Sequence, residues 1–174
     1  MLAGKRIECA AIAMLVAGLT FAGCGGGDGS TASTTTGGQQ LTKQELIAQG
    51  DAICRQANDK FAQLQQTPPT TPETAVTFTQ NLIDIQENQL GQLRELEPPP
   101  SLQSSLDDYL KALEKNIAVL KQGLKAAQQS DAAGYAKAQA KAVKGQVQRL
   151  ELARAAGFKE CSRPAGTASG SASG

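Results

Sequence analysis

Apolar side chains recur at steps of three and four residues along the middle of the chain, between about residues 41 and 160. This spacing places them on one face of a helix. The same region is rich in Ala, Gln, Leu and Lys, whereas Val, Ile and aromatic residues, which favour strands, are scarce. The pattern therefore predicts an all-α fold.

The first predicted helix opens at Thr42, which can cap the backbone while Glu45 completes a capping box. Leu41 and Leu46 supply the apolar contact that accompanies such a box. Proline interrupts helices, so we expect this one to end at Thr67-Pro68-Pro69. Its predicted core positions are Leu46, Ile47, Ile53, Cys54, Ala57, Phe61 and Leu64.

The second predicted helix begins at Thr71-Pro72, a capping residue followed by proline at the first helical position, and ends before Pro98-Pro99-Pro100. The third shows a seven-residue repeat that keeps one seam facing a partner helix. The predicted core positions of the second helix are Val76, Phe78, Leu82, Ile83, Ile85, Leu90, Leu93 and Leu96. Those of the third are Leu102, Leu106, Leu110, Leu113, Ile117, Leu120, Leu124 and Ala127.

The fourth predicted helix begins near Ser130-Asp131 and ends at Gly157, where Phe158 is placed for the apolar contact of a glycine cap. Its predicted core seam is Ala136, Ala140, Val143, Val147, Leu150 and Ala153. Short connections between the four helices predict an up-and-down four-helix bundle over residues 41–163. A three-helix bundle with one bent or frayed member is the alternative. We expect Tyr109 and Tyr135 at the edge of the core, with their hydroxyls in solvent.

A different pattern precedes the helices. Lys5 and Arg6 stand before "AAIAMLVAGLTFAG", an apolar run that is too short to span a bilayer comfortably and is typical of a secretory leader over residues 1–23. Its end, Phe21-Ala22-Gly23-Cys24, resembles the lipobox of bacterial lipoproteins. The resemblance implies lipidation of Cys24 and anchoring to the outer face of the bacterial cytoplasmic membrane. An ordinary cleaved leader and an uncleaved anchor are the alternatives.

The segments on either side of the helical region are low in apolar residues. Residues 24–40 are rich in Gly, Ser and Thr and carry no large apolar side chain, so they cannot bury enough surface to offset the entropy of ordering. We interpret them as a flexible tether with a reach of about 20–25 Å. Residues 164–174 have the same composition and are expected to form a disordered tail.

The lipobox resemblance changes how the four cysteines are read. If Cys9 leaves with the leader and Cys24 carries lipid, Cys54 and Cys161 remain, and an even remainder in an exported protein favours a disulfide. A buried reduced Cys54 with a free Cys161 is the alternative. Cys54 lies about 18 Å inside the first predicted helix. The pairing therefore requires that the first turns of that helix project past the bundle, or that residues 158–161 fold back beside it.

The composition argues against a metal site, a haem site or a catalytic site. The chain has no His, and both Met residues lie in the leader, so haem or di-metal ligation has no basis, and we expect no cofactor, metal or catalytic residue. Asp107-Asp108 is the only adjacent carboxylate pair and is interpreted as a solvated cluster in the first turn of a helix. Lys and Arg number 17 against 16 Asp and Glu, a balance that gives no general attraction to nucleic acid.

These observations favour a non-enzymatic lipoprotein. The residues "DAICRQAN" around Cys54 and "GF..C" ending at Cys161 are similar to small exported lipoproteins of actinobacteria whose functions are not established, and this resemblance brings no site residues with it. The leading hypothesis is an interaction module that binds an envelope protein or a wall component. The alternative is a carrier of a small apolar molecule or lipid, which needs an apolar volume of about 300 Å³ inside the bundle.

Overall fold

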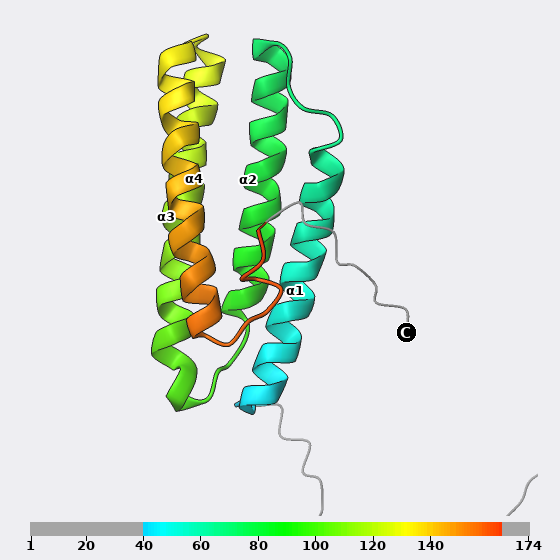
Figure 1. The fold of residues 1–174 in the computed structure, drawn as a ribbon, viewed down its shortest axis with the longest axis vertical. Helices are drawn as coiled ribbons and strands as arrows, with labels where there is room; N and C mark the ends of the chain where they lie inside the picture. The colour runs from blue at the N-terminus through cyan, green and yellow to red at the C-terminus, as the bar shows by residue number, and fades with distance from the viewer. Residues whose placement is uncertain (1–39, 165–174) are drawn as a thin grey trace, which may run out of the picture. The chain divides into compact units, whose positions relative to one another are not determined.

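The computed structural model describes residues 40–164. The predicted leader, Cys9, Cys24, residues 25–39 of the tether and residues 165–174 of the tail lie outside this range. Within it the chain forms four helices and no strand, with α1 at Lys43–Leu64, α2 at Pro72–Arg94, α3 at Pro100–Gln128 and α4 at Ala132–Ala155. Consecutive helices run in opposite directions (Figure 1). The all-α, up-and-down four-helix bundle with one disulfide is therefore confirmed.

The helix starts follow the local capping signals. The Thr42 side chain accepts from the Glu45 amide, and the Glu45 carboxylate accepts from the Thr42 amide at 2.8 Å. Hydrogen bonds from Thr42 lower the pKa of Glu45. Thr71 caps α2 in the same way, with Pro72 at the first helical position. Asp131 caps α4 by accepting from the Gly134 amide at 2.9 Å. Each of these contacts joins residues only a few positions apart, so the local sequence determines where each of these helices begins.

The end of α4 also matches the prediction. Gly157 has a φ of 92°, a conformation that favours glycine. The Gly157 amide donates to the Arg154 carbonyl and the Phe158 amide donates to the Ala153 carbonyl, both at 3.0 Å, which is the hydrogen-bond pattern of a Schellman cap. The cap turns the chain so that Phe158 enters the core, where it is 1% exposed.

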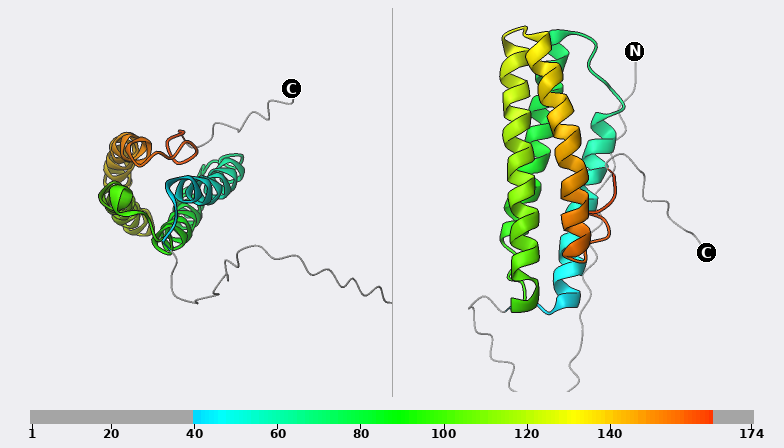
Figure 2. Two further views of the ribbon diagram at one scale, coloured as in Figure 1. Left: turned by 90° about the horizontal axis from the view of Figure 1, so that it is seen from below. Right: turned by 60° about the vertical axis from the view of Figure 1, so that its left-hand side comes forward.

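The four helices form an arc. Extensive packing joins α1 to α2, α2 to α3 and α3 to α4, whereas α1 and α4 do not pack along their length. Viewed from the end, the arc is open between α1 and α4, and the chain that follows α4 lies in this opening (Figure 2). A regular four-helix bundle would close it.

The packing face of α4 differs from the sequence prediction. Its buried small residues are Ala138, Ala142 and Ala153, whereas Val143 and Val147 are 61% and 57% exposed, and Ala136 and Ala140 are exposed as well. Most of the predicted α4 seam was therefore wrong. Small side chains allow close approach to α3, where a Cβ added to Gly123 would lie 3.2 Å from that of Ala138. The alanine face therefore packs on α3, and the two valines stay uncovered.

Gly50 of α1 offers a test of the packing at the C-terminal end. A Cβ at this position would overlap the ring of Phe158, which is buried in the core. We expect Gly50→Ala to lower the free energy of unfolding by about 1–3 kcal/mol, because overpacking forces the ring or the backbone to shift.

Gly91→Ala in α2 is the matched control, since its Cβ would meet nothing within 4 Å. That substitution should raise the free energy of unfolding by about 0.5–1 kcal/mol. Urea denaturation followed by circular dichroism measures both. Equal effects of the two substitutions would contradict the close contact between Gly50 and Phe158.

Candidate functional site

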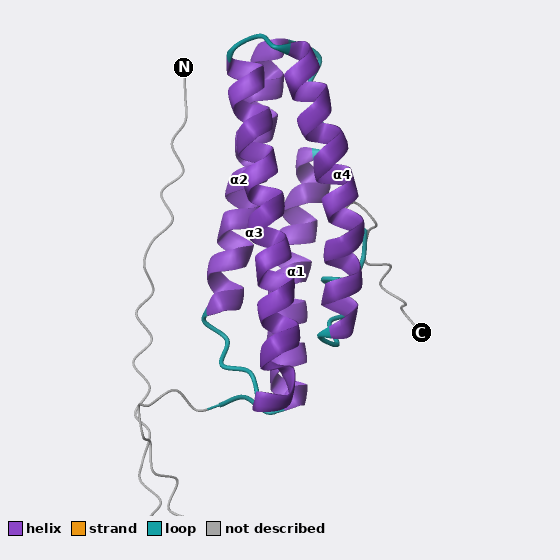
Figure 3. Ribbon diagram, turned by 90° about the vertical axis from the view of Figure 1, so that its left-hand side faces the viewer, coloured by secondary structure: helices purple, strands orange, loops and turns teal. Residues whose placement is uncertain are grey.

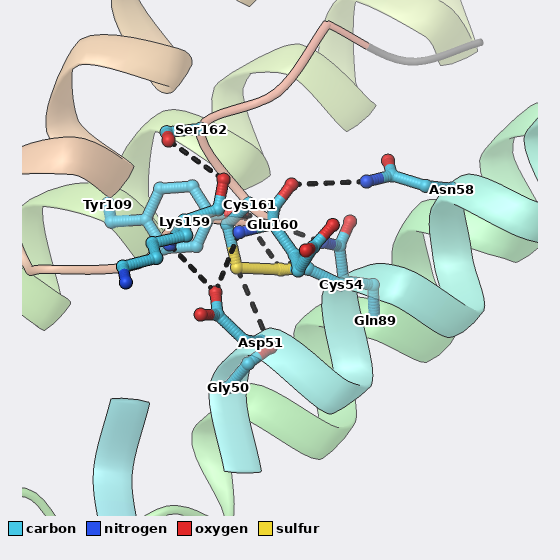
Figure 4. The surroundings of a disulfide bond; sticks show 10 residues. All are labelled: Gly50, Asp51, Cys54, Asn58, Gln89, Tyr109, Lys159, Glu160, Cys161 and Ser162. Carbon is cyan, nitrogen blue, oxygen red and sulfur yellow. Dashed lines mark hydrogen bonds between the residues drawn. A yellow bond between two sulfur atoms is a disulfide. The ribbon is translucent and has the colours of Figure 1, made fainter. Parts of the chain in front are cut away.

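The residues after α4 form a C-terminal segment, residues 156–164, that lies against the middle of α1 (Figure 4). Cys161 is joined to Cys54 by a disulfide with a Cα–Cα distance of 5.0 Å. The Asp51 carboxylate accepts from the backbone amides of Lys159 and Glu160 at 2.9 and 2.8 Å. On the next turn of α1, Asn58 Nδ2 donates to the Glu160 carbonyl at 3.1 Å. Contacts on both sides of Cys54 thus hold the segment in register.

Both geometric explanations for the position of Cys54 apply. The first turns of α1 extend beyond the end of α4 (Figure 3). Residues 158–161 then run back beside α1, as the contacts with Asp51 and Asn58 require. The C-terminal segment therefore fills the opening between α1 and α4 at one end of the bundle.

Tyr109 lies behind this segment, and its expected exposure was wrong. The residue is fully buried. Its hydroxyl is 3.8 Å from Cys54 Sγ and 3.5 Å from Gln89 Nε2, and its ring centroid is 5.9 Å from that of Phe158. Tyr109 falls three residues after Leu106 and four before Leu113, both buried, so the helical period alone could have placed it in the core.

Charged neighbours act on the Tyr109 phenol. Burial raises its pKa above the ordinary value. The Arg149 guanidinium opposes this shift through its charge and a hydrogen bond, while the Asp51 carboxylate reinforces it. Because the net shift is upward, the phenol is neutral at physiological pH and cannot balance the charge of Arg149.

A groove of about 290 Å³ opens beside the C-terminal segment, and all four helices contribute to its lining. Its apolar lining consists of Ala57, Phe61, Phe78, Leu82, Ile85, Leu120, Ala142 and Val143. Its polar lining consists of Asn58, Gln65, Gln86, Gln89, Asn116, Gln139, Gln146 and Arg149. The residues of α4 that line it extend from Gln139 to Arg149, which corresponds to about 15 Å along the helix.

The two ends of the groove differ in polarity. Gln89 and Arg149 interact with Tyr109, which in turn contacts Cys54, so these polar groups lie next to the C-terminal segment. Phe61 and Phe78 lie about two to three helical turns farther from Cys54 and Gln89 on their respective helices. The lining is therefore suited to a molecule with a polar head and an apolar body.

Two buried side chains in the lining have unused hydrogen-bonding atoms. Arg149 is 9% exposed, its Nε has no hydrogen-bond partner, and no carboxylate of residues 40–164 forms an ion pair with it. Asn116 Nδ2 donates to Gln86 Oε1 at 2.9 Å, but Asn116 Oδ1 has no partner. Buried polar atoms are nearly always paired in folded proteins, so this groove is unusual in leaving a donor and an acceptor free.

Sequence reasoning missed Arg149, because a cation on an amphipathic helix is ordinarily found on the solvent face. The sequence does contain a signal for the burial of this residue. Arg149 follows Gly145 by four residues and Ala142 by seven, so it shares the face of small residues that packs on α3.

The other sequence candidates take no part in this site. Asp107 accepts from Gln103 at 3.1 Å, and Asp108 pairs with Lys111 at 3.8 Å. Tyr135 is partly buried, with its hydroxyl 3.3 Å from Thr79 Oγ1. In the described part of the chain, no three His, Cys, Asp or Glu side chains gather as a metal site would need, and no helix combines the length and hydropathy needed to cross a membrane.

The chain was compared with protein-family models, with curated proteins and with solved structures, and none of them matches it.

Loss of the disulfide should destabilise the fold strongly. The bond closes a loop of 107 residues, and the chain-entropy estimate for such a loop is about 4–5 kcal/mol. We expect chemical reduction, or the variant Cys54→Ser/Cys161→Ser, to lower the free energy of unfolding by about that amount in urea titrations.

The control is the oxidised protein treated with a thiol-alkylating reagent before reduction. Neither Cys54 nor Cys161 should react until the disulfide is reduced, as read by peptide mass spectrometry. Labelling of both residues in protein isolated without reductant would contradict the bond.

Proposed function

We propose that this domain binds a small amphipathic molecule in the groove between α1 and α4. The observation that carries the proposal is the opening itself, a volume of about 290 Å³ with apolar side chains from all four helices and a polar end. Small-molecule sites are typically concave, mostly apolar and provided with a few polar groups, at volumes from about 300 Å³ upward. The groove lies at the lower limit of this range, which suits a single small molecule.

The uncovered face of α4 supports the same proposal. Val143 lines the groove, and Val147 lies one turn farther along the same side of the helix. Burying a valine side chain fully is worth about 1.5–3 kcal/mol. A bundle closed by α1 would gain this energy for Val143, so the open arrangement is costly unless another molecule covers that side chain.

A protein partner on the outside of α4 is the second candidate. It is favoured by the exposure of Val143 and Val147 themselves, because neighbouring apolar residues on a surface are typical of interaction sites. Val147 does not line the groove, so Val147→Gln separates the two candidates. It should leave small-molecule binding unchanged, whereas it should weaken a protein contact made through this face.

Filling the groove provides the direct test. Ala142 lines it and is 9% exposed, so a phenyl ring at this position would occupy the space. Isothermal titration calorimetry with decan-1-ol as a neutral probe should show binding to the full-length chain, here carrying Cys24→Ser so that no covalent lipid competes. We expect Ala142→Phe to weaken this binding at least tenfold.

Ala118→Phe is the matched control, because Ala118 is exposed on α3 and does not line the groove. It should bind decan-1-ol as the parent does. Circular dichroism melts of all three proteins confirm that they are folded. Absence of probe binding to the folded parent, or equal binding by the parent and Ala142→Phe, would reject the groove as a binding site.

We also propose that the domain works at the outer face of the cytoplasmic membrane, held there by lipid on Cys24. The proposal rests on the resemblance of Phe21-Ala22-Gly23-Cys24 to a lipobox. In bacteria fed labelled palmitate, the parent chain should carry label and sediment with membranes, and Cys24→Ser should lose both properties. Cys9→Ser is the control and should behave as the parent. Label retained by Cys24→Ser would exclude Cys24 as the lipid site.

A further inference from the structure

We infer that the ligand of this groove is an anion, a small acid with one apolar body, and that its acid group pairs with Arg149. The inference rests on the proposed binding function and specifies its ligand. It is carried by a buried cation that the described residues leave without a carboxylate partner, in the wall of an open groove.

The charge of Arg149 is permanent. A guanidinium does not lose its proton in proteins, so burial cannot neutralise it as it can neutralise a lysine. Taking such a charge out of water is unfavourable unless a counter-ion is placed beside it. Arg149 nevertheless lies 91% buried, since its exposed fraction is 9%, with no ion pair inside residues 40–164.

The surroundings of Arg149 leave this charge unbalanced. The polar residues of α2 and α3 that line the groove are the neutral amides Gln86, Gln89 and Asn116. Tyr109 is neutral as well. The Asp51 carboxylate acts on Tyr109 through its charge, but it forms no ion pair with Arg149, and its Oδ1 accepts from two backbone amides of the C-terminal segment. The polar end of the groove therefore holds a permanent cation that no carboxylate of residues 40–164 contacts.

The free atoms indicate the shape of the acid group. Arg149 Nε is buried and has no partner. An Nε–H and the adjacent terminal N–H form the edge of a guanidinium that binds a carboxylate through two parallel hydrogen bonds, and the guanidinium must turn toward the groove to present this edge to a ligand. Asn116 Oδ1 lies near Gly145, one helical turn before Arg149 on α4. A hydroxyl or N–H close to the acid group of the ligand would find an acceptor there.

The rest of the groove favours an apolar body. Leu82, Leu120, Phe61 and Ala142 line the part beyond Asn116. A ligand with one alkyl chain and an acid group at its end can place the acid group at Arg149 and the alkyl chain along these residues. A two-chain lipid is too large for a volume of about 290 Å³.

The test compares decanoate with decan-1-ol, which have the same chain and differ in charge. Calorimetry at neutral pH uses the full-length chain with Cys24→Ser. We expect decanoate to bind at least tenfold more tightly than decan-1-ol. In Arg149→Met, which keeps an apolar stem and removes the charge, decanoate should bind at least tenfold more weakly, while decan-1-ol binding should stay within about threefold of the parent.

Arg154→Met is the matched control, because Arg154 is exposed on the same helix and its removal changes the net charge equally. It should keep the preference for decanoate. The ligand-free melting temperature is a further readout. Arg149→Met should melt at or above the parent temperature, since it removes an uncompensated buried charge, whereas a purely structural Arg149 would make the variant melt lower.

The outcomes separate the two proposals. Equal affinity of the parent for decanoate and decan-1-ol, a preference that survives Arg149→Met, or a lowered melting temperature in that variant would overturn the role of Arg149. If decan-1-ol binding still depended on Ala142, the groove would stand as a binding site for neutral molecules. Binding of neither probe to the folded parent would reject both proposals.

Discussion

The attachment of the C-terminal segment to the middle of α1 sets the form of this bundle. Phe158 rests on Gly50, the backbone amides of residues 159 and 160 bind Asp51, and the disulfide fixes Cys161 to Cys54. A segment held in this way occupies the space in which α1 and α4 would otherwise meet. Because the two helices are kept apart at one end, the groove stays open along the rest of their length.

The same attachment creates a polar layer inside a small core. The Asp51 carboxylate accepts hydrogen bonds from the backbone of the C-terminal segment. The charges of Asp51 and Arg149 both act on the pKa of Tyr109, in opposite directions. A core built for stability alone would place apolar residues here, since buried charges without partners oppose folding. The disulfide offsets such a cost by restricting the unfolded chain. Buried polar groups that oppose folding are tolerated where a functional site needs them.

How far the sequence predicts the structure depends on the range of the interactions involved. The capping box at Thr42 and the glycine cap at Gly157 rely on neighbours within a few residues, and both were predictable. The face of α4 was not, because its valine and alanine faces can each pack, and the choice depends on close approaches to α3 such as the one at Gly123. The small residues Ala142 and Gly145 on the same face were a signal for the burial of Arg149, whereas the groove depends on the long-range attachment of the C-terminal segment, which the sequence alone could not place.

The two ends of the groove lie toward opposite ends of the bundle. Leu41 and α1 begin at the end of the bundle that the C-terminal segment closes, where the Leu41 amide binds the Glu97 carbonyl at 2.9 Å (Figure 1). The opposite end lies where α1 stops at Leu64, near Gln65 and Phe78. A ligand that pairs with Arg149 would therefore place its acid group toward the C-terminal segment and its apolar end toward Phe61 and Phe78, near the open end of the groove.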